Sequence, residues 1–144
     1  MDLKSRTEMG MALQPLTLVL VTDQFKCERL IRAGRQLAQR DGTTLEVINV
    51  AAAGVAQNPE AIEYLYRISK ENDAAMMIHY SDEPSRFITQ LIRDNRPSNV
   101  VTGLPQKSNS LLHKIWMRFE QVSFFTVDHD GKLSPVTLRD RVIA

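Results

Sequence analysis

Short runs of β-branched and other apolar residues alternate along this chain with longer stretches in which apolar residues recur every three or four positions. The short runs predict buried strands, and the longer stretches predict amphipathic helices that lie against them. The predicted strands cover residues 16–21, 45–50, 74–79, 99–102 and 123–127, and the predicted helices begin near residues 27, 59, 84 and 111. This alternation of strands and helices is typical of successive crossover units and therefore predicts a parallel sheet.

The predicted fold is a three-layer α/β domain with a five-stranded parallel sheet and helices on both faces. Residues 16–21 are apolar at nearly every position, which is typical of a strand covered on both faces, so this strand is expected to be central. Right-handed crossovers to both faces require the strand order to reverse, and the expected order is 3-2-1-4-5. A ligand crevice opens at such a reversal, here outside the carboxyl ends of the first and fourth strands.

Two segments are expected to border this crevice. Thr22 and Asp23 follow the first strand, and Gly103 follows the fourth strand. A polar turn then leads into the last helix through Gln106, Lys107, Ser108, Asn109 and Ser110. Because the N–H groups and the dipole at a helix start favour an anion, this turn is a candidate phosphate site. Ser108 and Asn109 are also preferred N-cap residues, so capping of the helix is the competing interpretation.

Composition indicates one domain with a substantial core and neither a nucleic-acid nor a membrane partner. The chain has 144 residues, of which 43% are hydrophobic, and its formal net charge is +1. No global field attracts nucleic acid, and no apolar run has the length of a membrane span, so we expect neither nucleic-acid binding nor membrane insertion. The single cysteine, Cys27, suits a reducing compartment, and we expect a cytoplasmic location. Residues 1–14 are predicted to form a leader, residues 15–128 the domain and residues 129–144 a tail to which no element is assigned.

The histidines and the single cysteine of the chain do not indicate a catalytic site. His79, His113 and His129 show no metal-ligand spacing, and no hydrolytic triad can be assembled. Cys27 falls on the apolar stripe of the first helix, where a buried thiol is the simpler interpretation than a nucleophile. We therefore predict no metal site and no enzyme activity.

Four segments carry a resemblance to a known family. They are residues 18–22, 27–33, 45–50 and 99–103, and the order and lengths of the elements agree from about residue 16 to residue 127. On these segments the chain resembles the universal stress protein domain, and in particular the version found in the sensor kinase of bacterial potassium uptake. The resemblance implies an adenine nucleotide alpha hydrolase-like fold, homodimerisation through the last strand and, in many members, adenine-nucleotide binding.

The nucleotide loop that the resemblance implies is only partly present. Members that bind nucleotide carry a glycine after the fourth strand, a second three positions on, and a third, followed by Ser or Thr, ten positions after that. Gly103 matches the first glycine, whereas Gln106 and Trp116 stand at the other two positions. The family's aspartate after the first strand falls on Thr22 or, one residue late, on Asp23. The resemblance thus implies a degenerate loop, with ATP or another adenine nucleotide as the candidate ligand.

The position and composition of the last predicted strand favour a dimer. Its residues are Ser123, Phe124, Phe125, Thr126 and Val127. An apolar strand at an uncovered sheet edge favours pairing with a second copy of itself. The alternative is that the tail after Gly131 folds back over this edge and keeps the chain monomeric.

Together these features predict a cytoplasmic binding and signalling module of the stress response, acting as a homodimer and without catalytic chemistry of its own. One alternative is a stress protein that binds ATP or hydrolyses it slowly, since related nucleotide hydrolases share the architecture. The other is a regulatory domain that partners a transporter or a sensor kinase, in which case its ligand is a protein surface.

Overall fold

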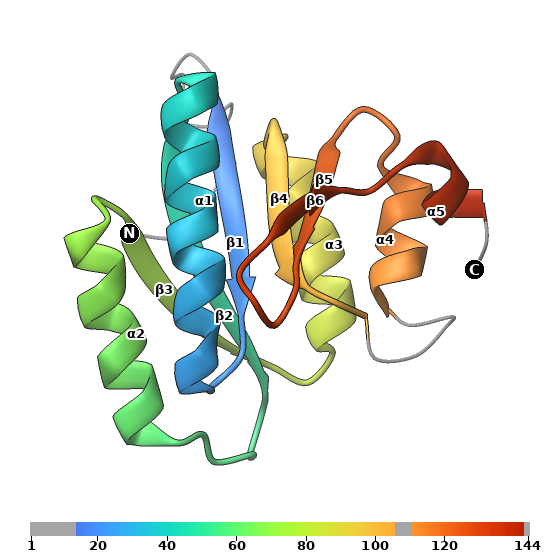
Figure 1. The fold of residues 1–144 in the computed structure, drawn as a ribbon. Coiled ribbons are helices and arrows are strands. Elements are labelled where there is room, and N and C mark those ends of the chain that lie inside the picture. The colour runs from blue at the N-terminus through green and yellow to red at the C-terminus, as the bar shows by residue number, and fades with distance from the viewer. Residues whose placement is uncertain (1–13, 106–110, 143–144) are drawn as a thin grey trace.

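The computed structural model describes residues 14–105 and 111–142, which form a central sheet with helices on both faces (Figure 1). The strands are β1 (Leu16–Val21), β2 (Thr44–Ala52), β3 (Ala75–Ser81), β4 (Asn99–Gly103), β5 (Ser123–Val127) and β6 (Leu133–Pro135). The helices are α1 (Glu28–Asp41), α2 (Pro59–Glu71), α3 (Pro84–Asn95), α4 (Leu111–Arg118) and α5 (Leu138–Val142), and a 3-10 turn, η1 (Phe25–Cys27), precedes α1.

The sheet has the strand order β3-β2-β1-β4-β5-β6. The first five strands of this order pair in parallel, whereas β6 is antiparallel to β5. The predicted three-layer α/β class and the predicted order 3-2-1-4-5 of the parallel strands are therefore confirmed. The strand count differs by one, because the tail that the sequence pattern leaves unassigned contributes a sixth strand.

The prediction that β5 is the open edge of the sheet is wrong. Its residues Phe125, Thr126 and Val127 lie opposite β6, and the N–H of Val136 donates to the carbonyl oxygen of Phe124 at 2.8 Å. The tail thus folds back over the strand, which is the alternative that the sequence leaves open. Since the outer edge of Ser123–Val127 is paired within the chain, the physical reason for a dimer through this strand is removed.

The side chain of Arg141 connects the end of the described tail to the segment between α4 and β5. Its Nη1 donates to the carbonyl oxygen of Phe119 at 3.1 Å, and its Nη2 donates to that of Val122 at 2.8 Å. Its guanidinium carbon also lies 5.3 Å from the centroid of the Phe124 ring. Carbonyls at the end of α4 attract a cation, so this contact stabilises both α4 and the position of β6.

The apolar core has two parts, one on each face of the sheet. Val19 is buried with residues of α1 and α2, whereas its neighbour Leu18 is buried with residues of α3 and α4. Both side chains are at most 1% exposed. Because alternate residues of a strand point to opposite faces, this double burial explains why residues 16–21 are apolar at nearly every position.

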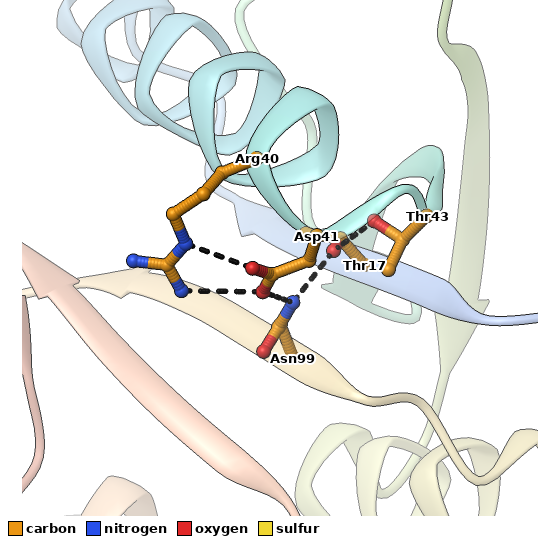
Figure 2. Close-up of polar contacts among 5 residues, drawn as sticks. All are labelled: Thr17, Arg40, Asp41, Thr43 and Asn99. Carbon is orange, nitrogen blue, oxygen red and sulfur yellow. Dashed lines mark hydrogen bonds and ion pairs between the residues drawn. The ribbon is translucent and has the colours of Figure 1, made fainter.

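A polar cluster joins the end of α1 to the starts of β1 and β4 (Figure 2). The buried Asn99 donates through Nδ2 to Oγ1 of Thr17 at 3.1 Å and to Oδ2 of Asp41 at 2.9 Å. Arg40 also donates to Asp41, and the hydroxyls of Thr17 and Thr43 share a 2.6 Å hydrogen bond. The hydrogen bonds from Arg40 and then from Asn99 lower the pKa of Asp41. The cluster lies at the amino ends of these strands, so it stabilises the register there.

Candidate functional site

A cleft of about 520 Å³ opens at the carboxyl ends of β1 and β4. In the sheet, β1 lies between β2 and β4, so the cleft is located where the strand order reverses. Thr22, which follows β1, and Gly103, which ends β4, both line it. The structure therefore brings together the two segments that the sequence places beside a crevice, and this is the position at which open α/β sheets bind ligands.

The cleft has an apolar interior and a cationic side. Five apolar lining residues, which we call the apolar floor, are Leu20, Ile48, Val50, Ile88 and Leu112. Lys26, Arg29 and His129 also line the cleft, whereas no Asp or Glu does so among residues 14–105 and 111–142. An apolar cavity with a few convergent polar groups is typical of a small-molecule site.

The two residues predicted after the first strand have different surroundings. Thr22 lines the cleft, with its Oγ1 3.4 Å from Sγ of the buried Cys27. Asp23 is not among the lining residues, and its Oδ2 accepts a hydrogen bond of 2.7 Å from the N–H of Asn58, the N-cap of α2. Of the two positions that the family's aspartate could match, Thr22 is the one on the cleft.

Gly103 presents open backbone to the cleft. A Cβ built on Gly103 would lie 3.9 Å from Nη2 of Arg29 and would meet no other described atom within 4 Å. This opening leaves room for a ligand group close to β4. The remaining predicted site residues, Gln106, Lys107, Ser108, Asn109 and Ser110, lie outside the described residues, so the phosphate turn stays a prediction.

The sequence pattern did not predict Lys26, Arg29 or His129 as cleft residues, and Arg29 is the most informative of the three. Helical periodicity alone places it with Arg32 on the solvent side of α1. The structure instead places its guanidinium in the cleft, because Arg29 belongs to the first turn of α1, which follows the end of β1 through the short turn η1. In a strand-helix unit the first helical turn lies at the crevice edge. A place in the first turn of the helix therefore could have identified Arg29 from the sequence. For such a residue this place predicts contact with a ligand better than helical periodicity does.

In the described part of the chain the histidines do not form a metal centre. Neither His79 nor His113 lines the cleft, and within the described part of the chain no group of three or more His, Cys, Asp or Glu side chains is arranged to hold a metal ion. His79 lies on β3, where its ring centroid is 4.9 Å from that of Phe87. Its Nε2 is buried without a hydrogen-bond partner in the described structure, and burial lowers the pKa of the imidazole.

We expect His79 to make stability fall at acidic pH. Its folded-state pKa lies below the ordinary value of 6.5, so protons bind the unfolded chain more readily. The contribution of the neutral ring to the free energy of unfolding is therefore fully present above about pH 6.5, and it is lost as the pH falls below that value. Urea unfolding at pH 7.5 and pH 5 measures this loss, and the His79→Leu variant should lose less stability between the two pH values than the wild type. An equal loss in both proteins contradicts the assignment.

None of the helices formed by the described residues has the length and apolarity needed to span a membrane.

Comparison with known proteins shows likeness at the level of the fold. No family model matches the chain, and no curated protein matches it.

Solved structures of universal stress proteins do match. One, from Archaeoglobus fulgidus, has 18% sequence identity, covers 78% of this chain and 93% of its own, and superposes with a TM-score of 0.54. Another member of that family, from Burkholderia pseudomallei, has 13% identity, 78% and 95% coverage and a TM-score of 0.52. The likeness extends over nearly the whole of these proteins, and it shows that the chain has the same fold.

A deacetylase shares this architecture as well. The N,N'-diacetylchitobiose deacetylase of Pyrococcus horikoshii matches with 11% identity and a TM-score of 0.53, and it covers 85% of this chain but 66% of its own. The fold is thus shared by universal stress proteins and by an enzyme, so the residues of the cleft, and not the fold, must indicate what this chain does.

Proposed function

We propose that this chain, which has the universal stress protein fold, is a binding and signalling module of the stress response whose small-molecule ligand occupies the cleft between β1 and β4. The observation that carries the proposal is the meeting of Thr22 and Gly103 on the walls of one cleft at the point where the strand order reverses. An adenine nucleotide is the first ligand to test, since the fold and the matching glycine both favour it.

The chemistry of the cleft supports binding rather than hydrolysis of a nucleotide. Hydrolysis needs a carboxylate to hold a metal ion near the phosphates. In the described part of the cleft no carboxylate is available, and Asp23 is held by the N–H of Asn58 at the start of α2. The available groups are hydrogen-bond donors and cations, which can hold and orient an anion.

Isothermal titration with ATP, ADP, AMP and a cyclic dinucleotide tests the proposal. We expect at least one of these to bind, and we expect Gly103→Leu to abolish the binding because the new side chain enters the open space beside Arg29. Gln90→Leu adds the same side chain to the exposed surface of α3 and should bind as the wild type does. Thermal unfolding shows whether both variants remain folded. Full binding by Gly103→Leu contradicts the proposal that the ligand lies in this cleft, and silence across the panel excludes these nucleotides as its ligand.

A further inference from the structure

Arg29 holds its guanidinium in the cleft by bonds to the backbone. Its Nε donates to the carbonyl oxygen of Asp128 at 2.8 Å, and its Nη1 donates to that of Lys26 at 2.6 Å. These carbonyls lie in the turn after β5 and in η1, so they approach the side chain from two separate elements. Both acceptors are neutral, and they fix the group without compensating its charge.

The third nitrogen of Arg29 is directed to the open space beside β4. Nη2 is the described atom that a Cβ on Gly103 would meet, at 3.9 Å. No carboxylate in residues 14–105 or 111–142 lies within ion-pair distance of Arg29. The described arginines that do form ion pairs, Arg32, Arg35, Arg40 and Arg86, lie elsewhere on the surface. Arg29 is therefore a fixed cation whose charge is left for a ligand.

The rest of the cleft restricts what such a ligand can be. Lys26 adds a second positive charge, and no described acidic residue lines the cleft to offset it. The apolar floor lies in the same cavity and offers surface to an apolar group. A ligand that satisfies both parts carries a negative group at one end and an apolar body at the other.

We propose that Arg29 binds the anionic group of the cleft ligand, and that this ligand is an amphipathic anion with its carboxylate or phosphate beside Gly103 and its apolar body on the apolar floor. The guanidinium presents planar donors that match either oxyanion, and a partly buried cation gains more from such a bond than an exposed one. The missing side chain at Gly103 provides the room. This inference rests on the proposed function, because it concerns the ligand of the same cleft.

Two pairs of probes test it, each consisting of an anion and a neutral molecule with the same body. They are AMP with adenosine, and octanoate with octanol, titrated into the full chain by calorimetry. We expect at least one anion to bind more tightly than its neutral partner. Arg29→Gln should lower the affinity for that anion by about ten- to a hundredfold and leave the neutral partner within about twofold. Arg32→Gln, one turn further along α1 and paired with Glu28, is the matched control and should change neither.

The outcomes separate the inference from the proposed function. Preference for AMP identifies a nucleotide phosphate, and preference for octanoate identifies an acyl carboxylate; either result with the loss in Arg29→Gln supports the inference. An equal loss for the anion and the neutral partner shows that Arg29 acts only by holding Asp128, and it overturns the inference. AMP binding that Arg29→Gln leaves unchanged also overturns it, while the proposed function stands. If no probe binds the wild type, the inference is overturned, while the nucleotide titration described above still decides the proposed function.

Discussion

Replacing Gly34 with alanine will destabilise this protein, although the same change in an exposed helix stabilises the helix by about 1 kcal/mol. Gly34 lies in the middle of α1, on the face that packs against the sheet. A Cβ at this position would lie 2.5 Å from Cγ2 of Val19 and 3.2 Å from Cδ1 of Leu45. Val19 is fully buried in the central strand, so the helix or the strand has to shift.

The overpacking therefore outweighs the gain in helix propensity. Inserting a methyl group into a packed core costs about 1–3 kcal/mol, and the 2.5 Å approach to Cγ2 of Val19 places this change in the upper part of that range. After the gain of about 1 kcal/mol in helix propensity, we expect a net loss of about 1–2 kcal/mol in the free energy of unfolding. Urea unfolding of Gly34→Ala measures this value. Val19→Ala removes the clashing atom, so the two changes together should cost less than the sum of the single changes. An increase in stability on Gly34→Ala would show that α1 is not packed closely against β1.

Asn99→Asp is expected to cost about 3 kcal/mol at pH 7. The change keeps the shape of the side chain but replaces the Nδ2 donor, which faces Oδ2 of Asp41 at 2.9 Å, by an acceptor (Figure 2). Two carboxylates then face each other where Asn99 is only 4% exposed. Burial and the like charge both oppose ionisation of the new group.

The sign of the pH dependence distinguishes this mechanism from a simple loss of packing. The pKa of the introduced carboxyl is raised above its unfolded value, so its penalty is largest at neutral pH and declines as the pH falls through the raised pKa. Wild-type Asp41 has a lowered pKa, so its own contribution is lost as the pH falls. Chemical unfolding at pH 7 and pH 4 compares the two trends. Adding Asp41→Asn to Asn99→Asp should restore at least about half of the lost free energy of unfolding. If the double variant is no more stable than Asn99→Asp alone, charge repulsion is not the cause of the loss.

The positions of the helices and strands follow from local pattern. Gly42 ends α1 with a φ of 67°, as expected for a glycine at the C-terminus of a helix. Pro59 and Pro84 begin α2 and α3, where their missing N–H groups cost nothing. Pairing of β1 with both β2 and β4 follows from continuous apolar character together with right-handed crossovers. These features depend on residues close together in the chain, so periodicity and end signals are enough to find them.

The tail shows where local pattern fails. Residues 133–135 form a strand because β5 offers them an unpaired edge, and not because of strong strand propensity of their own. Ser134 and Pro135 are poor strand residues, and Pro is tolerated there because β6 lies at the edge of the sheet. The prediction of an open edge at β5 was wrong for this reason, and the expected dimer interface depended on it.

Local pattern along the chain was enough to predict the fold class, the order of the parallel strands and the place at which Thr22 and Gly103 meet. Which side chains line that place depends on how the distant elements pack together. Arg29 and the carbonyl of Asp128 that holds it are 99 positions apart, and Asn99 and Asp41 are 58 apart. Burial of apolar residues repeats with the period of each helix or strand and can be detected along the chain. A polar contact between distant elements leaves no such repeat, because only the packed sheet and helices bring its two partners together.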